Sequence, residues 1–303
     1  MNYLDQLRQS AKQSGSIICM ELDPVFEQMP QIYANFKART EGFFEILFKK
    51  MKDEKVLPGA FKLNDGSYSR HDTVYDERFQ GSLAMAHTIK RIKEHFPEIP
   101  VILDSNRADT AEGLGSWKAD AVIVSPYMGT DSVMPFFERR QKNPEFPAMY
   151  CNEEKGKGVY VLTRTLNPGA KDFQNLKVVV GDVTMPLYRV VAKKVVELAK
   201  DNPGVGSVVG ATSPDELSDI AQLYAKSGAK VPLLIPGVGK QGGTAPEVME
   251  RLRAANYDLS LARINSSSGI IAPWGKEPAP KNWADMCIEQ LVKLNEEIGY
   301  KAA

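Results

Sequence analysis

The sequence predicts a single-domain α/β protein with the fold of a (β/α)8 barrel, or TIM barrel. Three observations predict it: eight short apolar segments recur along the chain, most are separated by segments with helical spacing, and several end in charged or glycine-rich turns. Alternation of strand and helix favours parallel pairing, and eight such units close most simply into a barrel. A doubly wound open sheet is the alternative, but the first predicted strand lacks the G-x-G-x-x-G turn typical of that fold.

The predicted strands are runs of β-branched and other apolar residues that are too short for buried helices. They cover residues 16–22, 59–63, 101–104, 120–125, 158–163, 205–209, 231–235 and 259–264. Apolar residues at helical spacing predict helices over 43–52, 81–96, 185–200 and 283–298. Ser213 with Glu216 predicts a capping box, with Pro214 at the first position of that helix. We expect one domain over residues 1–303, with extra loop over 139–181 around the fifth strand.

Composition is that of an ordinary soluble globular protein, with 43% hydrophobic and 25% charged residues among 303. Lys+Arg and Asp+Glu both number 38, so no overall field favours nucleic acid or an anionic membrane as a partner. No apolar run approaches the roughly 20 residues needed to cross a bilayer. The three cysteines have no metal-ligand spacing, and the N-terminus does not resemble a signal peptide. We therefore expect a cytoplasmic protein.

Charged residues gather where the predicted strands end. Asp104 closes the third strand, and Arg107 and Asp109 follow it directly. A carboxylate at the end of a buried strand is costly unless it is paired or used chemically, and these ends form the active site of a barrel. For Asp109 alone, capping of the next helix is the simpler alternative. Asp23 ends the first strand and Lys62 the second, so charges of both signs are expected around one rim.

Glycine-rich segments follow the last two predicted strands. They cover residues 237–243 after the seventh strand and 266–269 after the eighth. This is the usual phosphate position in a barrel, and backbone N–H groups of glycines approach phosphate oxygens closely. A phosphorylated small molecule is therefore the expected ligand.

Seven short motifs occur in a fixed order at the predicted strand ends. They are ELDP at 21–24, FKLN at 61–64, LDxxRxD at 103–109, SPYMG at 125–129, NPGA at 167–170, VGAT at 209–212 and LIPGVGxQGG at 234–243. In this order they resemble the motifs of orotidine 5'-phosphate decarboxylase in its longer bacterial form. The resemblance covers nearly the whole chain.

The resemblance implies decarboxylation of orotidine 5'-phosphate to UMP in pyrimidine biosynthesis, by a homodimer that needs no cofactor and no metal. It implies that Lys62, Asp104, Asn106 and Asp109 occupy the catalytic positions, with Asp109 acting across the dimer interface. The implied substrate contacts are Asp23, Asn64, Thr212, Pro236, Gly237, Gln241, Gly242, Gly243 and Ser268. Loss of CO2 leaves a carbanion at C6 of the pyrimidine, which a fixed ammonium can stabilise and then protonate.

Three departures from the family pattern affect residues that are expected to contact the substrate or take part in the reaction. Asn106 stands where a lysine is expected between the two aspartates, Leu166 where a serine is expected to meet the pyrimidine, and Ser268 where an arginine is expected to hold the phosphate. The stretch 110–119 is also shorter than the family's third helix, by roughly two to three helical turns. These substitutions indicate a degenerate paralogue or an engineered variant.

Neighbouring residues are candidates to compensate for these departures. Lys62 is the best remaining proton donor, although a plain salt bridge is the alternative for it. Lys240 or Arg263 could replace the phosphate arginine, and for Lys240 a solvated surface position is the favoured interpretation.

Three functions remain open on the sequence. The first is the decarboxylase, with activity weakened by Asn106, and the second is a catalytically silent nucleotide-binding pseudoenzyme of the same fold. The third is another sugar-phosphate lyase or synthase that needs a divalent metal held by Asp and Glu. The first two imply a small nucleotide as ligand, with no nucleic acid and no membrane as partner.

Overall fold

The centre of the protein is a closed barrel of eight parallel strands in the order β1-β10-β9-β8-β5-β4-β3-β2. The computed structural model describes residues 1–31, 33–105, 117–137 and 156–302. The barrel strands are β1 (Ile18–Glu21), β2 (Ala60–Asn64), β3 (Val101–Asp104), β4 (Ala121–Val124), β5 (Gly158–Arg164), β8 (Val205–Val209), β9 (Leu233–Ile235) and β10 (Ala262–Ser266). The predicted (β/α)8 barrel is confirmed, and the open sheet is wrong because β1 pairs with both β2 and β10.

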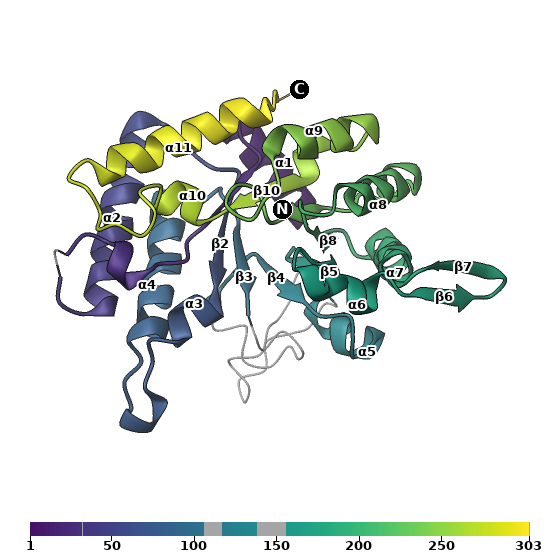
Figure 1. Ribbon diagram of the computed structural model, residues 1–303, viewed down its shortest axis with the longest axis horizontal. Helices are drawn as coiled ribbons and strands as arrows, with labels where there is room; N and C mark the ends of the chain where they lie inside the picture. The colour runs from purple at the N-terminus through teal and green to yellow at the C-terminus, as the bar shows by residue number, and fades with distance from the viewer. Residues whose placement is uncertain (32, 106–116, 138–155, 303) are drawn as a thin grey trace.

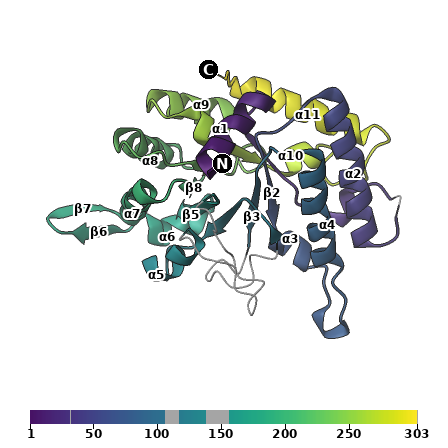
Figure 2. The ribbon, with the colours of Figure 1, turned by 180° about the vertical axis from the view of Figure 1, so that it is seen from behind.

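Helices surround the barrel (Figures 1 and 2). They are α1 (Tyr3–Ser14), α2 (Phe36–Glu54), α3 (Asp65–Ser69), α4 (Gln80–His95), α5 (Thr130–Val133), α6 (Lys171–Gln174), α7 (Leu187–Asp201), α8 (Pro214–Lys226), α9 (Ala245–Ala254), α10 (Ser268–Ile271) and α11 (Trp283–Ile298). In both views α2 and α4 lie side by side at one flank of the barrel. Throughout the described ranges, every helix is too short or too polar to cross a membrane.

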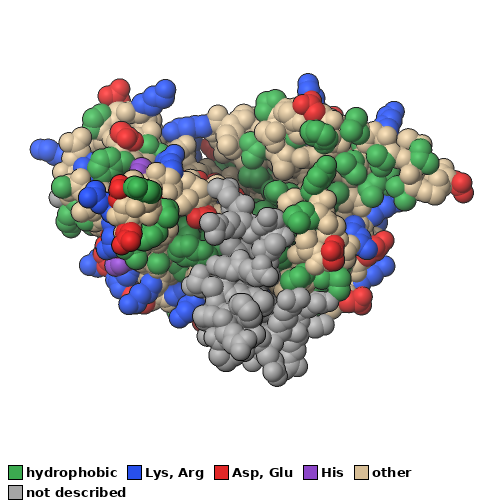
Figure 3. Space-filling model, turned by 90° about the horizontal axis from the view of Figure 1, so that it is seen from below, with side chains coloured by type: hydrophobic (Ala, Val, Ile, Leu, Met, Phe, Trp, Pro, Cys, Tyr) green, Lys and Arg blue, Asp and Glu red, His purple; other side chains and the backbone are tan. Residues whose placement is uncertain are grey.

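The face of the protein in Figure 3 carries charged side chains of both signs. On the face in Figure 3, acidic and basic side chains are interspersed. This distribution agrees with the equal counts of the two kinds of residue in the sequence.

The barrel strands are buried along most of their length, as expected for parallel strands covered by helices. Arg263 of β10 is fully buried. Its guanidinium donates to the carbonyl oxygens of Leu7 at 2.6 Å and Gly59 at 3.1 Å, and to the hydroxyl of Ser10 at 2.8 Å. Arg263 thus ties α1 and the start of β2 to β10. The hypothesis that it holds a phosphate is wrong, because these partners already occupy its donors.

Two elements begin three or more residues away from their predicted starts, because local structure sets these boundaries. α2 begins at Phe36, seven residues before the predicted start, because the side chain of Asn35 accepts a hydrogen bond from Ala38 N at 2.9 Å. β10 begins at Ala262, because Leu259–Leu261 forms a short 3-10 turn. The last predicted strand is therefore shifted toward the C-terminus.

The predicted capping box of α8 is wrong. Pro214 occupies the first turn and Ser213 the cap position, as expected, but the Ser213 side chain makes no capping hydrogen bond. The Glu216 carboxylate instead accepts hydrogen bonds from Asn175 at 2.9 Å and from Arg164 at 3.4 Å. Because its carboxylate pairs with Arg164 at the end of β5, Glu216 does not cap α8.

The expected extra loop over 139–181 contains regular structure in its described part, residues 156–181. After β5 and α6, an antiparallel hairpin forms from β6 (Lys177–Val180) and β7 (Val183–Pro186). It projects from the flank opposite α2 (Figures 1 and 2). Its turn includes Gly181 with φ +60°, a conformation that glycine adopts without strain.

Candidate active site

A cavity of about 420 Å³ lies at the carboxyl ends of the barrel strands, and every strand of the barrel contributes a side chain to its wall. The wall has two halves. Polar side chains come from β10, β1, β2 and β3, and apolar ones from β4, β5, β8 and β9: Asn265, Glu21, Lys62 and Asp104 in the first half, and Ile123, Leu162, Val208 and Leu234 in the second. Such a cavity suits a ligand with a flat apolar ring and a set of hydrogen-bonding groups.

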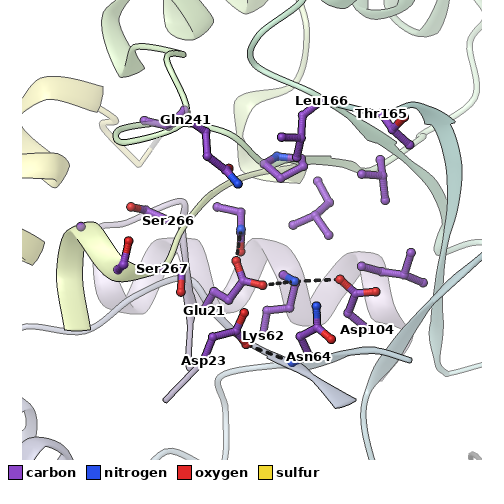
Figure 4. A pocket seen from close by; sticks show the side chains of 18 of the residues that line it. Glu21, Asp23, Lys62, Asn64, Asp104, Thr165, Leu166, Gln241, Ser266 and Ser267 are labelled. Atoms are coloured by element: carbon purple, nitrogen blue, oxygen red, sulfur yellow. Dashed lines mark hydrogen bonds and ion pairs between the residues drawn. The ribbon is translucent and has the colours of Figure 1, made fainter. Parts of the chain in front are cut away.

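Lys62 is the centre of the polar half (Figure 4). Its side chain is only 5% exposed, and its ammonium pairs with Asp104 Oδ2 at 2.9 Å and with Glu21 Oε1. The register of the barrel explains the second contact, because Glu21 of β1 lies directly beside Lys62 of β2. Burial lowers the pKa of Lys62, but the charges of Glu21 and Asp104 outweigh burial and raise it above its usual value. Lys62 therefore stays charged at neutral pH.

Two carboxyl groups beside Lys62 differ in their affinity for protons. Burial raises the pKa of Asp23 to about 7, and the negative charge of Glu21 acts in the same direction. Burial also acts to raise the pKa of Glu21, but the charge of Lys62 dominates and lowers it. One Asp23 oxygen accepts a hydrogen bond from Asn64 N at 3.3 Å. At neutral pH, Glu21 is therefore ionised while Asp23 is partly protonated.

Most of the predicted site residues in the described ranges line this one cavity. They are Asp23, Lys62, Asn64, Asp104, Pro236, Gln241 and Ser268. Asn64 also has a structural task, because its side-chain oxygen accepts a hydrogen bond from Gly66 N at 2.9 Å and caps α3. Leu166, one of the three departures, lines the cavity as well. In Figure 4 it lies with Gln241 across the cavity from Asp23 and Asn64.

Four predicted substrate contacts lie outside the cavity wall: Thr212, Gly237, Gly242 and Gly243. The Thr212 hydroxyl donates to the carbonyl oxygen of Leu166 at 2.8 Å, so it supports the neighbouring loop. The N–H groups of Gly242 and Gly243 donate to Gly239 O and Gly237 O, both at 3.0 Å. The amides of Gly242 and Gly243 therefore form hydrogen bonds within the turn. In this structure these glycines do not face the cavity, in contrast to the prediction.

Steric demands explain two glycines in this turn. Gly242 has φ +103°, which a side chain would strain. A Cβ added at Gly243 would lie 2.6 Å from the Cβ of Ala211 and 2.8 Å from Gly237 O. The glycine-rich composition therefore reflects the fold of the loop.

Lys240 belongs to the same loop and lines the cavity beside Ser268. Its ammonium donates to the carbonyl oxygens of Ser268 at 3.3 Å and Ala272 at 3.2 Å. The residue is exposed, as expected for a solvated lysine, yet its ammonium lies at the cavity rim. It places a positive charge where the sequence resemblance lacks an arginine.

Two predicted catalytic residues, Asn106 and Asp109, lie outside the described residues. The sequence did not single out Glu21 or Asn265 as site residues. Glu21 and Asn265 both line the cavity, and Asn265 Nδ2 donates to Glu21 Oε2 at 2.7 Å. A carboxylate ending the apolar run ICME was the available signal for Glu21, whereas nothing in the sequence distinguished Asn265 from a loop asparagine.

A closed parallel barrel with a buried ammonium and three carboxyl groups at its strand ends has the architecture of a (β/α)8-barrel enzyme. The particular family follows from the sequence match. A model of the orotidine 5'-phosphate decarboxylase / HUMPS family matches residues 71–272, two thirds of the chain. The chain belongs to this family, and the resemblance drawn from the seven motifs is confirmed.

Individual relatives agree with this assignment. The chain is 31% identical over 278 residues to the orotidine 5'-phosphate decarboxylase of Halorubrum lacusprofundi, covering 89% of this chain and 88% of the relative. It is 34% identical over 273 residues to that of Herpetosiphon aurantiacus, covering 88% of each chain. The solved structure of Leishmania donovani OMP decarboxylase matches with a TM-score of 0.66 and 26% identity, over 98% of this chain and 99% of that one.

Proposed function

We infer that this protein is an orotidine 5'-phosphate decarboxylase, a carboxy-lyase of pyrimidine biosynthesis that forms UMP. Membership of the family supports this inference. The structural observation that carries it is the buried Lys62 ammonium, held between Glu21 and Asp104 in the wall of the cavity. The relatives are named as decarboxylases, so they do not favour the alternative of a silent nucleotide-binding protein.

We propose that the two halves of the cavity bind different parts of the substrate. The pyrimidine ring packs on the apolar half, near Leu162 and Leu166. Asp23 and Asn64 meet the ribose hydroxyls, and the substrate carboxylate lies beside Asp104. Burial of the ring on apolar side chains and hydrogen bonds to the sugar then fix the C6 carbon near Lys62.

Lys62 has the properties that the reaction requires. When CO2 leaves, the electron pair of the broken bond stays on C6, and a fixed ammonium in a buried site stabilises this charge strongly. A proton from the ammonium then forms the C6–H bond, and solvent returns a proton to the amine. Binding of the remote phosphate offsets the cost of holding the substrate carboxylate near Asp104.

The phosphate is placed at the rim, between the loop after β9 and the residues after β10. Pro236, Gln241 and Ser268 line this part of the cavity, together with Lys240. Hydrogen bonds among Gly237, Gly239, Gly242 and Gly243 hold the loop in shape, and Thr212 supports it through Leu166. Lys62 is already paired with two carboxylates, so Lys240 is the basic side chain of the described wall that is available to neutralise the phosphate.

Replacing Lys240 by methionine is expected to lower kcat/KM for orotidine 5'-phosphate by about 10-fold or more, because a charged hydrogen bond to the phosphate contributes roughly 1.5–3 kcal/mol. Lys276→Met is the matched control, since Lys276 is an exposed lysine that does not line the cavity. Steady-state kinetics with orotidine 5'-phosphate and with orotidine measure the effect. An equal loss with orotidine, which has no phosphate, would contradict this role.

We propose a homodimer, in which the partner subunit's Asp109 completes each active site. This proposal rests on the family resemblance and on the position of Asp109 five residues after Asp104. Sedimentation equilibrium of the purified protein is expected to give twice the mass of the 33.5 kDa chain. A monomer that still decarboxylates the substrate would remove Asp109 from the mechanism.

The direct test of the function is an absorbance assay that measures consumption of orotidine 5'-phosphate, with and without a metal chelator. Calorimetry measures the binding of UMP in parallel. We expect formation of UMP that the chelator does not affect. Binding of UMP without turnover at high enzyme concentration would instead select the silent nucleotide-binding protein. Activity that the chelator abolishes would select a metal-dependent lyase or synthase.

We further place the enzyme in the cytoplasm, where the buried free thiols of Cys19 and Cys287 persist.

A further inference from the structure

The polar half of the cavity holds more negative than positive charge. Three carboxyl groups, those of Glu21, Asp23 and Asp104, surround the single ammonium of Lys62. With all four groups ionised, their charges sum to two negative units. A nucleotide phosphate brings further negative charge to the cavity, so a proton kept by this cluster favours its binding.

The side chains of Glu21 and Asp23 both line the cavity and lie next to each other (Figure 4). Two neighbouring carboxylates repel each other when both are ionised, so one of them tends to keep a proton. The proton resides on Asp23, because burial raises the pKa of Asp23 to about 7 whereas Lys62 lowers that of Glu21. Figure 4 shows both side chains on the side of the Lys62 ammonium away from Asp104.

The surroundings keep Glu21 as the ionised member of this pair. Asn265 of β10 donates to Glu21 Oε2 at 2.7 Å, while Lys62 of β2 pairs with Oε1. The side chain of Asn265 is 4% exposed, so the contact is shielded from water. Around Asp23 lie the N–H of Asn64 and, on α3, the hydroxyl of Ser67 and the buried Tyr68.

We propose that Glu21 is a positioning residue of the active site, which fixes the Lys62 ammonium against Asp104 and shares with Asp23 a proton that favours the binding of an anionic nucleotide. This proposal rests on the proposed function for the identity of the nucleotide. It assigns Glu21 no contact with the reacting atoms; Glu21 acts through Lys62 and Asp23.

The expected signature is uptake of a proton on binding. At pH 8 the free enzyme has lost most of the Asp23 proton, and the approaching phosphate favours its return. The phosphate of UMP is itself fully ionised at this pH, because its second pKa is about 6. For the same reason, kcat/KM is expected to fall as pH rises through about 7, the pKa of Asp23.

Calorimetry of UMP binding at pH 8, in two buffers of different ionisation enthalpy, measures the protons taken up. The native protein is expected to take up close to one proton per UMP. Glu21→Gln is expected to take up almost none, because loss of the Glu21 charge lowers the pKa of Asp23 and leaves it ionised before and after binding. The same variant is expected to lose the fall of kcat/KM near pH 7, and to have a lower kcat at pH 6 because Lys62 is held on one side only.

Glu216→Gln is the matched control, since Glu216 also accepts from an asparagine and pairs with a basic residue but does not line the cavity. It is expected to keep the native proton uptake and pH profile. The proposal is overturned if the native protein binds UMP at pH 8 without proton uptake, a measurement that needs no variant. It is also overturned if folded Glu21→Gln takes up as many protons as the native protein. Proton-linked binding without turnover would count against the decarboxylase function while supporting the role of Glu21.

Discussion

Lys62→Met is expected to lower kcat/KM for orotidine 5'-phosphate by about 10³-fold or more. The loss of one preorganised donor to a developing negative charge typically costs 10²- to 10³-fold, and Lys62 is proposed both to stabilise the carbanion and to protonate it. The substitution also leaves Glu21 and Asp104 without their shared cation. Breaking a buried ion pair destabilises a protein by roughly 3–5 kcal/mol, so a thermal melt must accompany the kinetics.

Lys50→Met provides a matched control for this variant. Lys50 also lies between two carboxylates, with Nζ 2.7 Å from Glu54 and 2.6 Å from Asp285, but it is on α2 at the surface. We expect native kinetics for Lys50→Met. If folded Lys62→Met protein decarboxylates the substrate at the native rate, Lys62 is a structural ion pair and the proposed mechanism is wrong.

The second large effect is a gain. Asn106→Lys is expected to raise the decarboxylation rate by about 10²- to 10³-fold, the factor associated with one preorganised donor. The physical reason is that the family resemblance places a lysine ammonium at this position, whereas the amide of Asn106 carries no charge and cannot deliver a proton. Single-turnover absorbance measurements at saturating enzyme separate this change in the chemical step from changes in binding.

Asn106→Gln is the control for the gain, because it changes the length of the side chain without adding charge. We expect its rate to stay at the native level. If Asn106→Lys is folded and binds UMP but is no faster than the native protein, the limiting defect lies elsewhere. The change to Leu166 and the short stretch 110–119 are then the positions to restore.

The fold was largely predictable because a parallel barrel repeats one simple pattern. A buried strand such as Val101–Asp104 is apolar up to its last residue, where a carboxylate marks the strand end, so it can be recognised without knowing its neighbours. Boundaries set by single hydrogen bonds were less predictable, as at Asn35, whose side chain starts α2 early. The capping box at Glu216 was predicted wrongly for a similar reason, because Glu216 of α8 pairs with Arg164 of β5, which is distant in the sequence.

The site was predictable where one residue at a strand end sufficed, as for Lys62 and Asp104. Glu21 was missed as a member of the site because its importance comes from Lys62 beside it on β2 and Asn265 on β10, which only the closed barrel brings together. Gly242 was predicted to face the ligand, yet its amide bonds within its own loop. Whether a glycine amide is free depends on how the turn closes, which composition alone does not determine.

A crystal structure of the UMP complex would show whether the nucleotide binds at the strand ends. We expect UMP in this cavity, with its ring against Leu162, its ribose near Lys62 and its phosphate within hydrogen-bonding distance of Gln241 and Lys240. UMP bound at saturating concentration on any other surface, with this cavity occupied only by water, would contradict it.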